Sequence, residues 1–412
     1  MLDFLLRRYV HQGSLTVRYP DAKTRTYGEG EPRIAIAIKD RPALVALSLD
    51  PDLKLGELYM DGRLIIEDGD IVGLMDLLMG NIARVGGASG THQALRFVRQ
   101  ALRAFAQWNP VSAARAHVAH HYDLSSRLYD LFLDVSRQYS CAYFAHDDDT
   151  LETAQAEKKR HIALKLNIDR PDLSVLDIGC GWGGLAMDLA REHRAKVMGI
   201  TLSTEQLAVA QELARQNALA DRVRFELVDY RALTGRFDRI ISVGMFEHVG
   251  AGYYPDYFAK VREVLADDGV MLLHTIGRAD GPGATNAWIQ KYIFPGGYAP
   301  ALSEIVPIIE KAGLLVTDIE VLRLHYAKTL SQWQKRFQAN RAEIATLYDE
   351  RFCRMWEFYL AGAEMAFRHE NQVVYQIQIA KRVDALPLTR DYMIHPRGDA
   401  ETAAQAPVRA VA

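Results

Sequence analysis

Residues 175–184 read VLDIGCGWGG, and this stretch decides the fold. Its apolar run Val175, Leu176 and Ile178 suits an interior strand of a parallel sheet. The glycines that follow allow the backbone to approach a ligand closely before a helix begins. The stretch therefore predicts a nucleotide-cofactor site at the end of a buried strand.

Two classes of nucleotide cofactor fit this turn. Gly179, Gly181 and Gly184 satisfy the G-x-G-x-x-G spacing of NAD-binding domains. That fingerprint also requires an Asp or Glu about 20 residues further on, which holds the ribose hydroxyls. The second strand, expected over residues 195–200, is followed by Thr201 and has no acidic residue at its end. The missing acid argues against NAD.

Acidic side chains lie at two other strand ends instead. Asp177 directly precedes the glycines, and a third strand over residues 223–228 ends in Asp229 and Tyr230. A carboxylate there can accept a hydrogen bond from an adenine amino group, or it can simply cap the loop. With Asp177 in place, the arrangement resembles the class I methyltransferases that use S-adenosylmethionine (SAM).

Length and composition are those of an ordinary globular protein with room for two domains. The chain has 412 residues, of which 49% are apolar and 25% charged. Its cysteines, Cys141, Cys180 and Cys353, are few and widely spaced, which argues against a disulfide framework and against a zinc site. No metal is expected. The sequence contains no apolar run of the ~18 residues that a spanning helix needs and no secretory signal, so we expect a cytoplasmic location.

The net charge is only −3, but basic residues are concentrated in one segment. Residues 77–122 contain no Asp or Glu, and a helix over 91–106 would place Arg96, Arg99 and Arg103 on one face beside an apolar stripe. This pattern is typical of a helix on an anionic membrane surface, where each arginine contributes at most ~1 kcal/mol. A solvated helix covering the core is the alternative. The segment favours nucleic acid less, because no recognised binding module or interleaved aromatic residues accompany the charge.

We divide the chain into residues 1–85, a basic helical linker at 86–122, a catalytic domain at 123–396, and a disordered tail at 397–412. The first part reads as a small α+β domain without a catalytic cluster. Its expected elements are a hairpin formed by 14–19 and 25–27, strands at 33–39 and 43–49, and a helix at 71–79.

The catalytic domain alternates helix and strand, which predicts a doubly wound sheet with ligands beyond the carboxyl ends of its strands. Helices are expected at 150–166, 185–192 and 204–217, and strands at 175–178, 195–200, 223–229, 237–243, 269–274 and 314–322. Two long, aromatic-rich helices, 330–368 and 371–383, are expected to close the domain.

Longer motifs narrow the chemistry. The chain carries HYDLSSRLYDLFLD, YSCAYF, LDIGCGWGGLA, GITLSTEQ, FDRIISVGMFEHVG, LLHTIG and KYIFPGG in that order. Together these motifs closely resemble the cyclopropane-fatty-acyl-phospholipid synthase family, and the likeness extends over residues 122–326. GELYMDG at 56–62 resembles the lipid-associated N-terminal domain of the bacterial members that act on phospholipids, which the mycolic-acid-modifying relatives generally lack.

The resemblance implies a class I SAM methyltransferase fold with a smaller N-terminal α+β domain, acting on unsaturated phospholipids at the cytoplasmic face of the inner membrane. The methyl group of SAM is added to a cis double bond of an acyl chain, and a proton is then lost as the ring closes. An alkene is a weak nucleophile, so the site must align the reactants and exclude water from the carbocation. Family members commonly form homodimers.

In the family, the base that removes the proton is a bound bicarbonate ion. Its cradle maps onto Cys141, Glu247, His274, Ile276 and Tyr326. Glu247 can accept a hydrogen bond from bicarbonate, while His274 and Tyr326 can donate or relay, and the backbone at the other two positions completes the shell. The alternatives are that Glu247 caps a loop and that His274 is a satisfied core histidine. The surroundings of Tyr326, RLHYAKT, match the family more loosely.

The family resemblance also implies the residues that contact the cofactor. Asp177 lies beside the glycine turn and is one of them. The family places Tyr139 and Ser140 near the methionine moiety, Gly179 and Gly181 beneath it, Thr201 and Gln206 toward the ribose, and Asp229 with Tyr230 at adenine. Some members carry a cysteine in the C-terminal helix, but the aligned residue here is Ala363. A cysteine nucleophile is therefore not required. His248 can be read as a base or as a side chain that points into the fold.

Two other functions remain open at this point. A SAM-dependent enzyme of the same lineage could add the methyl group without closing a ring, which leaves a methyl or methylene branch. A non-catalytic lipid-binding protein could retain the fold. Glu247, with the bicarbonate shell it implies, favours ring closure.

Overall fold

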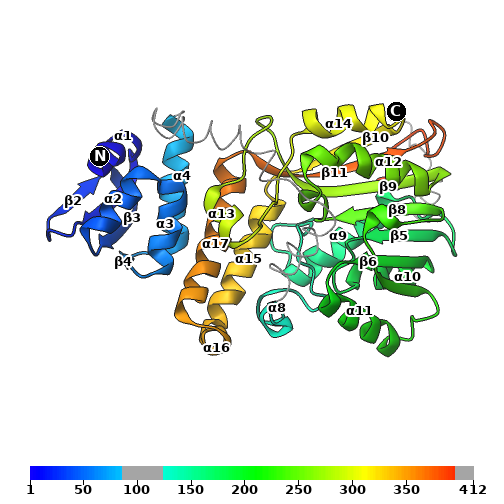
Figure 1. Ribbon diagram of the computed structural model, residues 1–412, viewed down its shortest axis with the longest axis horizontal. Coiled ribbons are helices and arrows are strands. Elements are labelled where there is room, and N and C mark those ends of the chain that lie inside the picture. The colour runs from blue at the N-terminus through cyan, green and yellow to red at the C-terminus, as the bar shows by residue number, and fades with distance from the viewer. Residues whose placement is uncertain (86–123, 395–412) are drawn as a thin grey trace, which may run out of the picture.

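The computed structural model describes residues 1–85 and 124–394. A small sheet unit lies at one end of the elongated molecule and a large sheet at the other, with the helices α13, α15 and α17 between them (Figure 1). The basic segment with Arg96, Arg99 and Arg103, and the tail after residue 397, lie outside the described residues.

The N-terminal unit is a four-stranded sheet with the order β2-β1-β3-β4. Its strands are β1 (Gln12–Arg18), β2 (Thr24–Tyr27), β3 (Glu29–Ile38) and β4 (Leu64–Asp68), and its helices are α1 (Leu2–Tyr9), α2 (Arg41–Leu49), α3 (Pro51–Met60) and α4 (Ile71–Val85). Strands β1 and β2 pair antiparallel, which confirms the predicted hairpin. The helix predicted at 71–79 is confirmed by α4.

The strand predicted over residues 43–49 is wrong, because these residues form α2. The helix begins after Asp40, whose carboxylate accepts a hydrogen bond from the Ala43 backbone N–H at 2.8 Å. Pro42 occupies the first turn, where its missing N–H is not needed. An N-cap followed by proline marks the start of a helix, and this signal outweighs the apolar run.

The large sheet has seven strands in the order β10-β11-β9-β8-β5-β6-β7. They are β5 (Ser174–Ile178), β6 (Lys196–Thr201), β7 (Val223–Leu227), β8 (Phe237–Val243), β9 (Leu265–Arg278), β10 (Leu315–Leu322) and β11 (Gln372–Ala380). Six of them run in the same direction, and β11 lies antiparallel between β9 and β10.

Apolar clusters cover both faces of this sheet. Within β5, Val175 packs with Ile162 of α9 on one face, while Leu176 packs with Phe258 of α12 on the other. This alternation places helices on both sides and confirms the predicted doubly wound fold. The helices are α8 (Ser126–Phe132), α9 (Leu151–Lys165), α10 (Gly184–His193), α11 (Thr204–Gln216), α12 (Tyr254–Val264), α13 (Ala287–Tyr292), α14 (Leu302–Lys311), α15 (His325–Ala339), α16 (Arg341–Leu347) and α17 (Glu350–His369).

The C-terminal part differs from the prediction in two places. Residues 371–383 were expected to be helical, but QVVYQIQIA forms the strand β11. Its β-branched and aromatic residues are buried between β9 and β10, a setting in which strand residues are favoured. The helix predicted at 330–368 is divided into α15, α16 and α17, and α17 begins at Asp349, which caps the Phe352 N–H at 2.7 Å.

The N-terminal unit packs directly against α13 and α17 through α3, which carries the GELYMDG motif. A Cβ atom on Gly56 would lie 2.5 Å from Trp288 Nε1 and 2.7 Å from Phe358. Next to it, Glu57 accepts hydrogen bonds from Lys291 Nζ at 2.6 Å and from the Tyr292 hydroxyl at 2.9 Å. The two units therefore meet at a close-packed contact that leaves no room for a methyl group on Gly56.

Replacing Gly56 tests this contact. Without the contact, Gly56→Ala in a helix would stabilise the fold by about 0.5–1 kcal/mol. We expect instead that overpacking against Trp288 and Phe358 lowers the free energy of unfolding by about 1–3 kcal/mol, measured in urea. Gly252→Ala is the control, because a Cβ there meets no atom within 4 Å. A Gly56→Ala protein as stable as the control contradicts the prediction.

Candidate functional site

A pocket opens where β5 runs into the glycine turn. Gly179, Gly181 and Gly183 have φ values of +83°, +56° and +82°, which favour glycine. A Cβ on Gly179 would lie 2.7 Å from the Met245 Cβ, whereas a Cβ on Gly181 would meet no atom within 4 Å. Gly179 therefore packs closely against Met245, whereas the space beside Gly181 is open.

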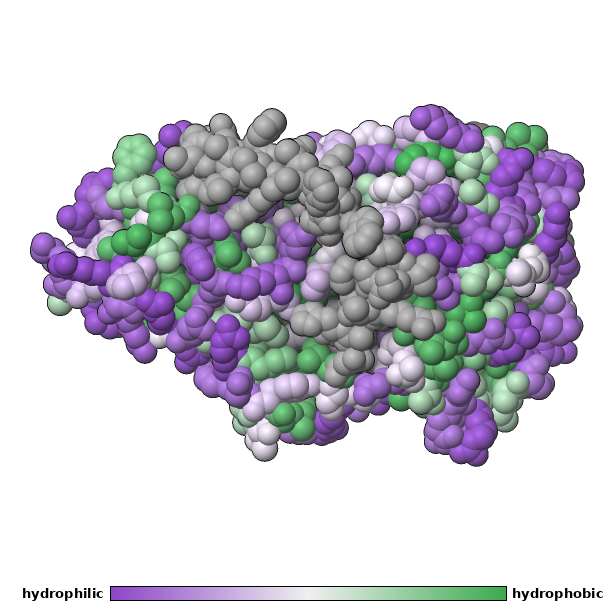
Figure 2. All heavy atoms as spheres, viewed as in Figure 1, coloured by the Kyte–Doolittle hydropathy of each residue, from purple (hydrophilic) through white to green (hydrophobic). Residues whose placement is uncertain are grey.

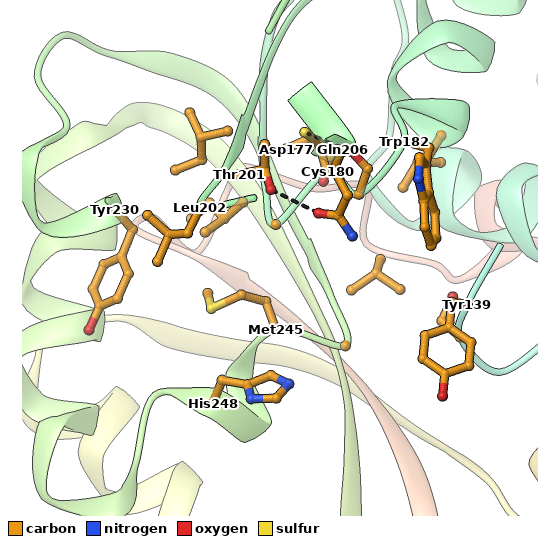
Figure 3. A pocket seen from close by; sticks show the side chains of 18 of the residues that line it. Tyr139, Asp177, Cys180, Trp182, Thr201, Leu202, Gln206, Tyr230, Met245 and His248 are labelled. Atoms are coloured by element: carbon orange, nitrogen blue, oxygen red, sulfur yellow. Dashed lines mark hydrogen bonds between the residues drawn. The ribbon is translucent and has the colours of Figure 1, made fainter. Parts of the chain in front are cut away.

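The structure brings all nine predicted cofactor residues to this pocket. They are Tyr139, Ser140, Asp177, Gly179, Gly181, Thr201, Gln206, Asp229 and Tyr230. Figure 3 shows Thr201 and Gln206 on one side of the pocket, Tyr139 and Trp182 on another, and Tyr230 apart from both. Arg137, Trp182 and Met245 also line the pocket and were not predicted. Trp182 lies inside the glycine motif, and this position in the sequence could have indicated that it lines the pocket.

Thr201 and Gln206 form a polar edge of the pocket. The Thr201 hydroxyl donates a hydrogen bond to Gln206 Oε1 at 2.9 Å, which leaves the amide nitrogen facing the pocket (Figure 3). Ser203 caps α11 by accepting from the Gln206 backbone N–H at 3.2 Å. The start of α11 thus positions the side-chain amide of Gln206, the residue for which the family resemblance implies a contact with the ribose of the cofactor.

Asp229 both caps a loop and borders the pocket. Its carboxylate accepts from the Arg231 backbone N–H at 3.0 Å at the start of the 3₁₀ turn η1 (Tyr230–Ala232). It also forms a two-point ion pair with the Arg231 guanidinium, with distances of 2.8 and 2.7 Å. The loop-capping alternative for Asp229 is therefore confirmed. The contact with adenine stays a prediction, for which acceptor positions remain, since a carboxylate has about four.

Asp177 is a buried acidic residue at the edge of the pocket. It ends β5 behind the glycine turn and is almost completely buried. Burial raises the pKa of Asp177 to about 7, although the nearby Lys158 acts in the opposite direction. Asp177 therefore exchanges its proton near neutral pH while it borders the pocket.

Glu247 lies beyond the end of β8, in the 3₁₀ turn η2 (Phe246–His248). Its Oε1 accepts a hydrogen bond from the Ile276 backbone N–H at 2.5 Å. Its Oε2 is buried and has no hydrogen-bond partner among the described residues. Burial raises the pKa of Glu247 to about 7, and the bond from Ile276 opposes the shift. Glu247 therefore holds the backbone of β9 as a capping carboxylate does, and its second oxygen remains available to a bound partner.

His274 lies on β9, two residues before Ile276, so both side chains face the same side of the strand. Its Nδ1 lies 3.1 Å from Gln376 Nε2 on the paired strand β11. Burial lowers the pKa of His274 to about 3, and the charge of Lys158 acts in the same direction. His274 is therefore a neutral donor.

Cys141 and Tyr326 are brought together through α15. The Ala142 N–H, next to Cys141, donates to Thr329 Oγ1 at 3.0 Å, one turn after Tyr326. Tyr326 packs edge-on against Phe367 at 4.9 Å between ring centroids. Cys141, Ile276 and Tyr326 belong to the same apolar cluster. Burial raises the pKa of the Cys141 thiol, so this residue is not a thiolate nucleophile.

His248 and Cys353 are the two remaining residues that the sequence analysis considered for a chemical role. His248 lines the pocket and packs against Phe294, with 5.9 Å between the ring centroids. Cys353 is buried in α17, where burial raises the pKa of its thiol.

Within residues 1–85 and 124–394 no group of His, Cys, Asp and Glu side chains is arranged to hold a metal ion. In the same part of the chain, no helix is long and apolar enough to cross a membrane.

Comparisons with known proteins identify the family of this chain. The family model for mycolic acid cyclopropane synthetase matches residues 111–377, and a model for a domain of unknown function (DUF7884) matches residues 2–83. A probable fatty acid methyltransferase of Pseudomonas putida is 39% identical over 88% of this chain and 92% of its own. A cyclopropane-fatty-acyl-phospholipid synthase of Escherichia coli K12 is 37% identical over 85% and 88%, and a tuberculostearic acid methyltransferase of Mycobacterium tuberculosis is 34% identical over 90% and 89%.

Solved structures give the same result. The cyclopropane synthase MmaA2 of Mycobacterium tuberculosis superposes with a TM-score of 0.62 at 34% identity, covering 65% of this chain and 98% of its own. The mycolic acid cyclopropane synthase CmaA1, complexed with SAH and CTAB, has the same TM-score and identity over 66% of this chain and 99% of its own. The sequence-based expectations of a SAM methyltransferase fold and of an enzyme are confirmed, which removes the non-catalytic alternative. The chain is an enzyme of the mycolic acid cyclopropane synthetase family.

Proposed function

We propose that this enzyme transfers a methylene group from SAM across the cis double bond of unsaturated phospholipid acyl chains, forming cyclopropane fatty acids. A bound bicarbonate ion takes up the proton that is lost when the ring closes. The observation that carries this proposal is Glu247, whose Oε2 is a buried acceptor with no partner among the described residues. The phospholipid substrate is supported by the Escherichia coli relative, which matches most of the chain.

The pocket fits SAM, which supplies an electrophilic methyl group when bound. The open space beside Gly181 allows a ligand to lie against the backbone of the glycine turn. The Gln206 amide is fixed as a donor toward the ribose, and Asp229 with Tyr230 offers an acceptor and an apolar ring to adenine. Tyr139 and Ser140 lie where the methionine moiety is expected.

An aromatic wall beside Tyr139 excludes water from the reacting centre. Tyr139 stacks on Trp333 with 5.2 Å between the ring centroids, and its hydroxyl lies 3.0 Å from that of Tyr359. Trp333 in turn packs edge-on against Tyr326 at 5.8 Å. Aromatic faces attract cations without reacting as bases, by about 2 kcal/mol when desolvated. Such a wall protects a carbocation that water would otherwise capture.

The residues around Glu247 fit a bicarbonate ion. Bicarbonate has one O–H donor and several acceptor oxygens, so it can satisfy Glu247 Oε2 and accept from the N–H of a neutral His274 ring. The Ile276 N–H is already bonded to Glu247, so it orients the carboxylate and does not bind the ion directly. Cys141 and Tyr326 supply the remaining wall from the facing segments. Glu247 thereby holds the base and does not need to act as the base itself.

A second product is possible for the same site. The relatives named as fatty acid and tuberculostearic acid methyltransferases favour methyl transfer without ring closure. Both reactions begin with the same methyl transfer and differ in where the proton is lost. Glu247 favours the cyclopropane, because a base held beside the new methyl group removes its proton before the cation rearranges.

We also place the enzyme at the cytoplasmic surface of the inner membrane, as a peripheral protein and as a homodimer. In this proposal residues 1–85 form the lipid-associated domain, residues 123–396 form the catalytic domain, and the acid-free segment at 86–122 adds basic contacts. Four large apolar side chains support the location, since they are exposed on and next to α1 and α2 of the N-terminal unit: Met1, Phe4, Val45 and Leu49. Figure 2 shows apolar surface over this end of the molecule.

Replacing Glu247 tests the chemistry. We expect Glu247→Gln to reduce SAM turnover on unsaturated phospholipid vesicles by at least about 100-fold, because the base is no longer held. The affinity for S-adenosylhomocysteine, measured by calorimetry, should stay within a few fold. Glu364→Gln is the control, since Glu364 is also buried but pairs with Arg368 on α17. Turnover of Glu247→Gln at the control's rate would overturn the role of Glu247.

Introducing acidic residues into the exposed apolar surface of the N-terminal unit tests the proposed membrane contact. Phe4 and Val45 are 64% and 56% exposed, and burying one such side chain in lipid contributes about 1.5–3 kcal/mol. The double variant Phe4→Glu/Val45→Glu should therefore bind unsaturated phospholipid vesicles at least about tenfold more weakly in flotation assays. Val383→Glu is the control, at a position 86% exposed after β11. Equal binding by the double variant and the control would refute this surface as the membrane contact.

A further inference from the structure

A fully buried lysine lies directly behind the pocket. Lys158, on α9, has no exposed surface, and its Nζ donates to Gln138 Oε1 at 2.8 Å and to Ser140 Oγ at 2.9 Å. Both acceptors belong to residues that line the pocket, whereas Lys158 is not among the lining residues in the described part of the chain. Any effect of Lys158 on a ligand is therefore transmitted through these two partners.

The neighbouring turn of α9 holds the same segment by its backbone. Gln155 donates its amide to Ser140 O at 3.0 Å and to Gln138 O at 3.3 Å. With Gln155 fixing the main chain, Lys158 is not needed merely to hold the segment in place. Its contacts are made to side-chain oxygens, so its specific effect is on how those side chains are oriented.

Lys158 holds its two partners as a donor in its ammonium form. Burial and, to a smaller extent, the charge of Lys159 lower the pKa of Lys158 to about 7, while the carboxylates of Asp134 and Asp177 act in the opposite direction. An ammonium group has three donors and no acceptor, so Ser140 Oγ must accept from it. The single hydroxyl hydrogen of Ser140 is then directed away from Lys158. Because Ser140 lines the pocket, that hydrogen becomes available to a ligand.

We propose that Lys158 is a positioning residue which orients the Ser140 hydroxyl as a donor to the carboxylate of the methionine moiety of SAM. This inference rests on the proposed function, which places that moiety at Tyr139 and Ser140. In this arrangement the Ser140 hydroxyl donates to a charged group, and hydrogen bonds to charged groups are the stronger ones. The pair Lys158–Ser140 therefore recognises the acidic end of the cofactor.

The test compares two ligands that differ only in the carboxylate. Binding of SAM and of decarboxylated SAM is measured by calorimetry, without lipid, to the wild type and to Lys158→Met. We expect Lys158→Met to weaken SAM binding at least about tenfold and to leave decarboxylated SAM within about twofold. Lys165→Met is the control, because Lys165 is a buried lysine of the same helix that pairs with Glu320.

A second variant keeps the test valid if Lys158→Met folds poorly. Ser140→Ala should lose the same preference for SAM over decarboxylated SAM, and adding Lys158→Met to it should cause no further loss. Equal weakening of both ligands by Lys158→Met, or independent losses from the two variants, would overturn the inference. A wild-type protein that binds neither ligand would instead overturn the proposed function.

Discussion

The hydrogen bond from the Ile276 N–H to Glu247 Oε1 is the interaction on which the site depends. It joins the turn after β8 to the strand β9, and it orients the carboxylate so that Oε2 remains buried and available. This bond holds Oε1 on the backbone of β9, while Oε2 has no hydrogen-bond partner among the described residues. The fold therefore maintains an acceptor in an apolar environment, where its interaction with a bound partner is strong.

Two halves of the site meet along the short segment 138–141. On one side, the segment lines the cofactor pocket, where α9 fixes it through Gln155 and Lys158. On the other side, Cys141 belongs to the apolar cluster that also contains Tyr326. In the proposed reaction, the methyl donor and the proton acceptor would thus be positioned by one continuous stretch of chain. This arrangement suits a reaction in which the carbocation must be deprotonated before water reaches it.

Patterns within one element were enough to predict much of the site. The glycine turn at 175–184 and the strand ends at Thr201 and Asp229 predicted the pocket, because parallel strands deliver their carboxyl ends to one edge of the sheet. Contacts between distant elements could not be predicted in this way. Lys158 lies in LETAQAEKKRHIALK, a polar helix without a clear apolar face, and only the tertiary structure buries it. The strand β11 was predicted as a helix because the pairing that buries it on both sides is not visible in its own sequence.

The central claim is that the base held by Glu247 closes a ring, and analysis of the lipid product tests it most directly. Purified enzyme, SAM and vesicles of a cis-unsaturated phospholipid are incubated with bicarbonate, and the acyl chains are then examined by mass spectrometry and proton NMR. The account predicts chains that gain the mass of one methylene group, lose their olefinic protons and show the resonances of a cyclopropane ring. A product that gains the same mass but retains a double bond, or carries a methylene or methyl branch, would contradict it.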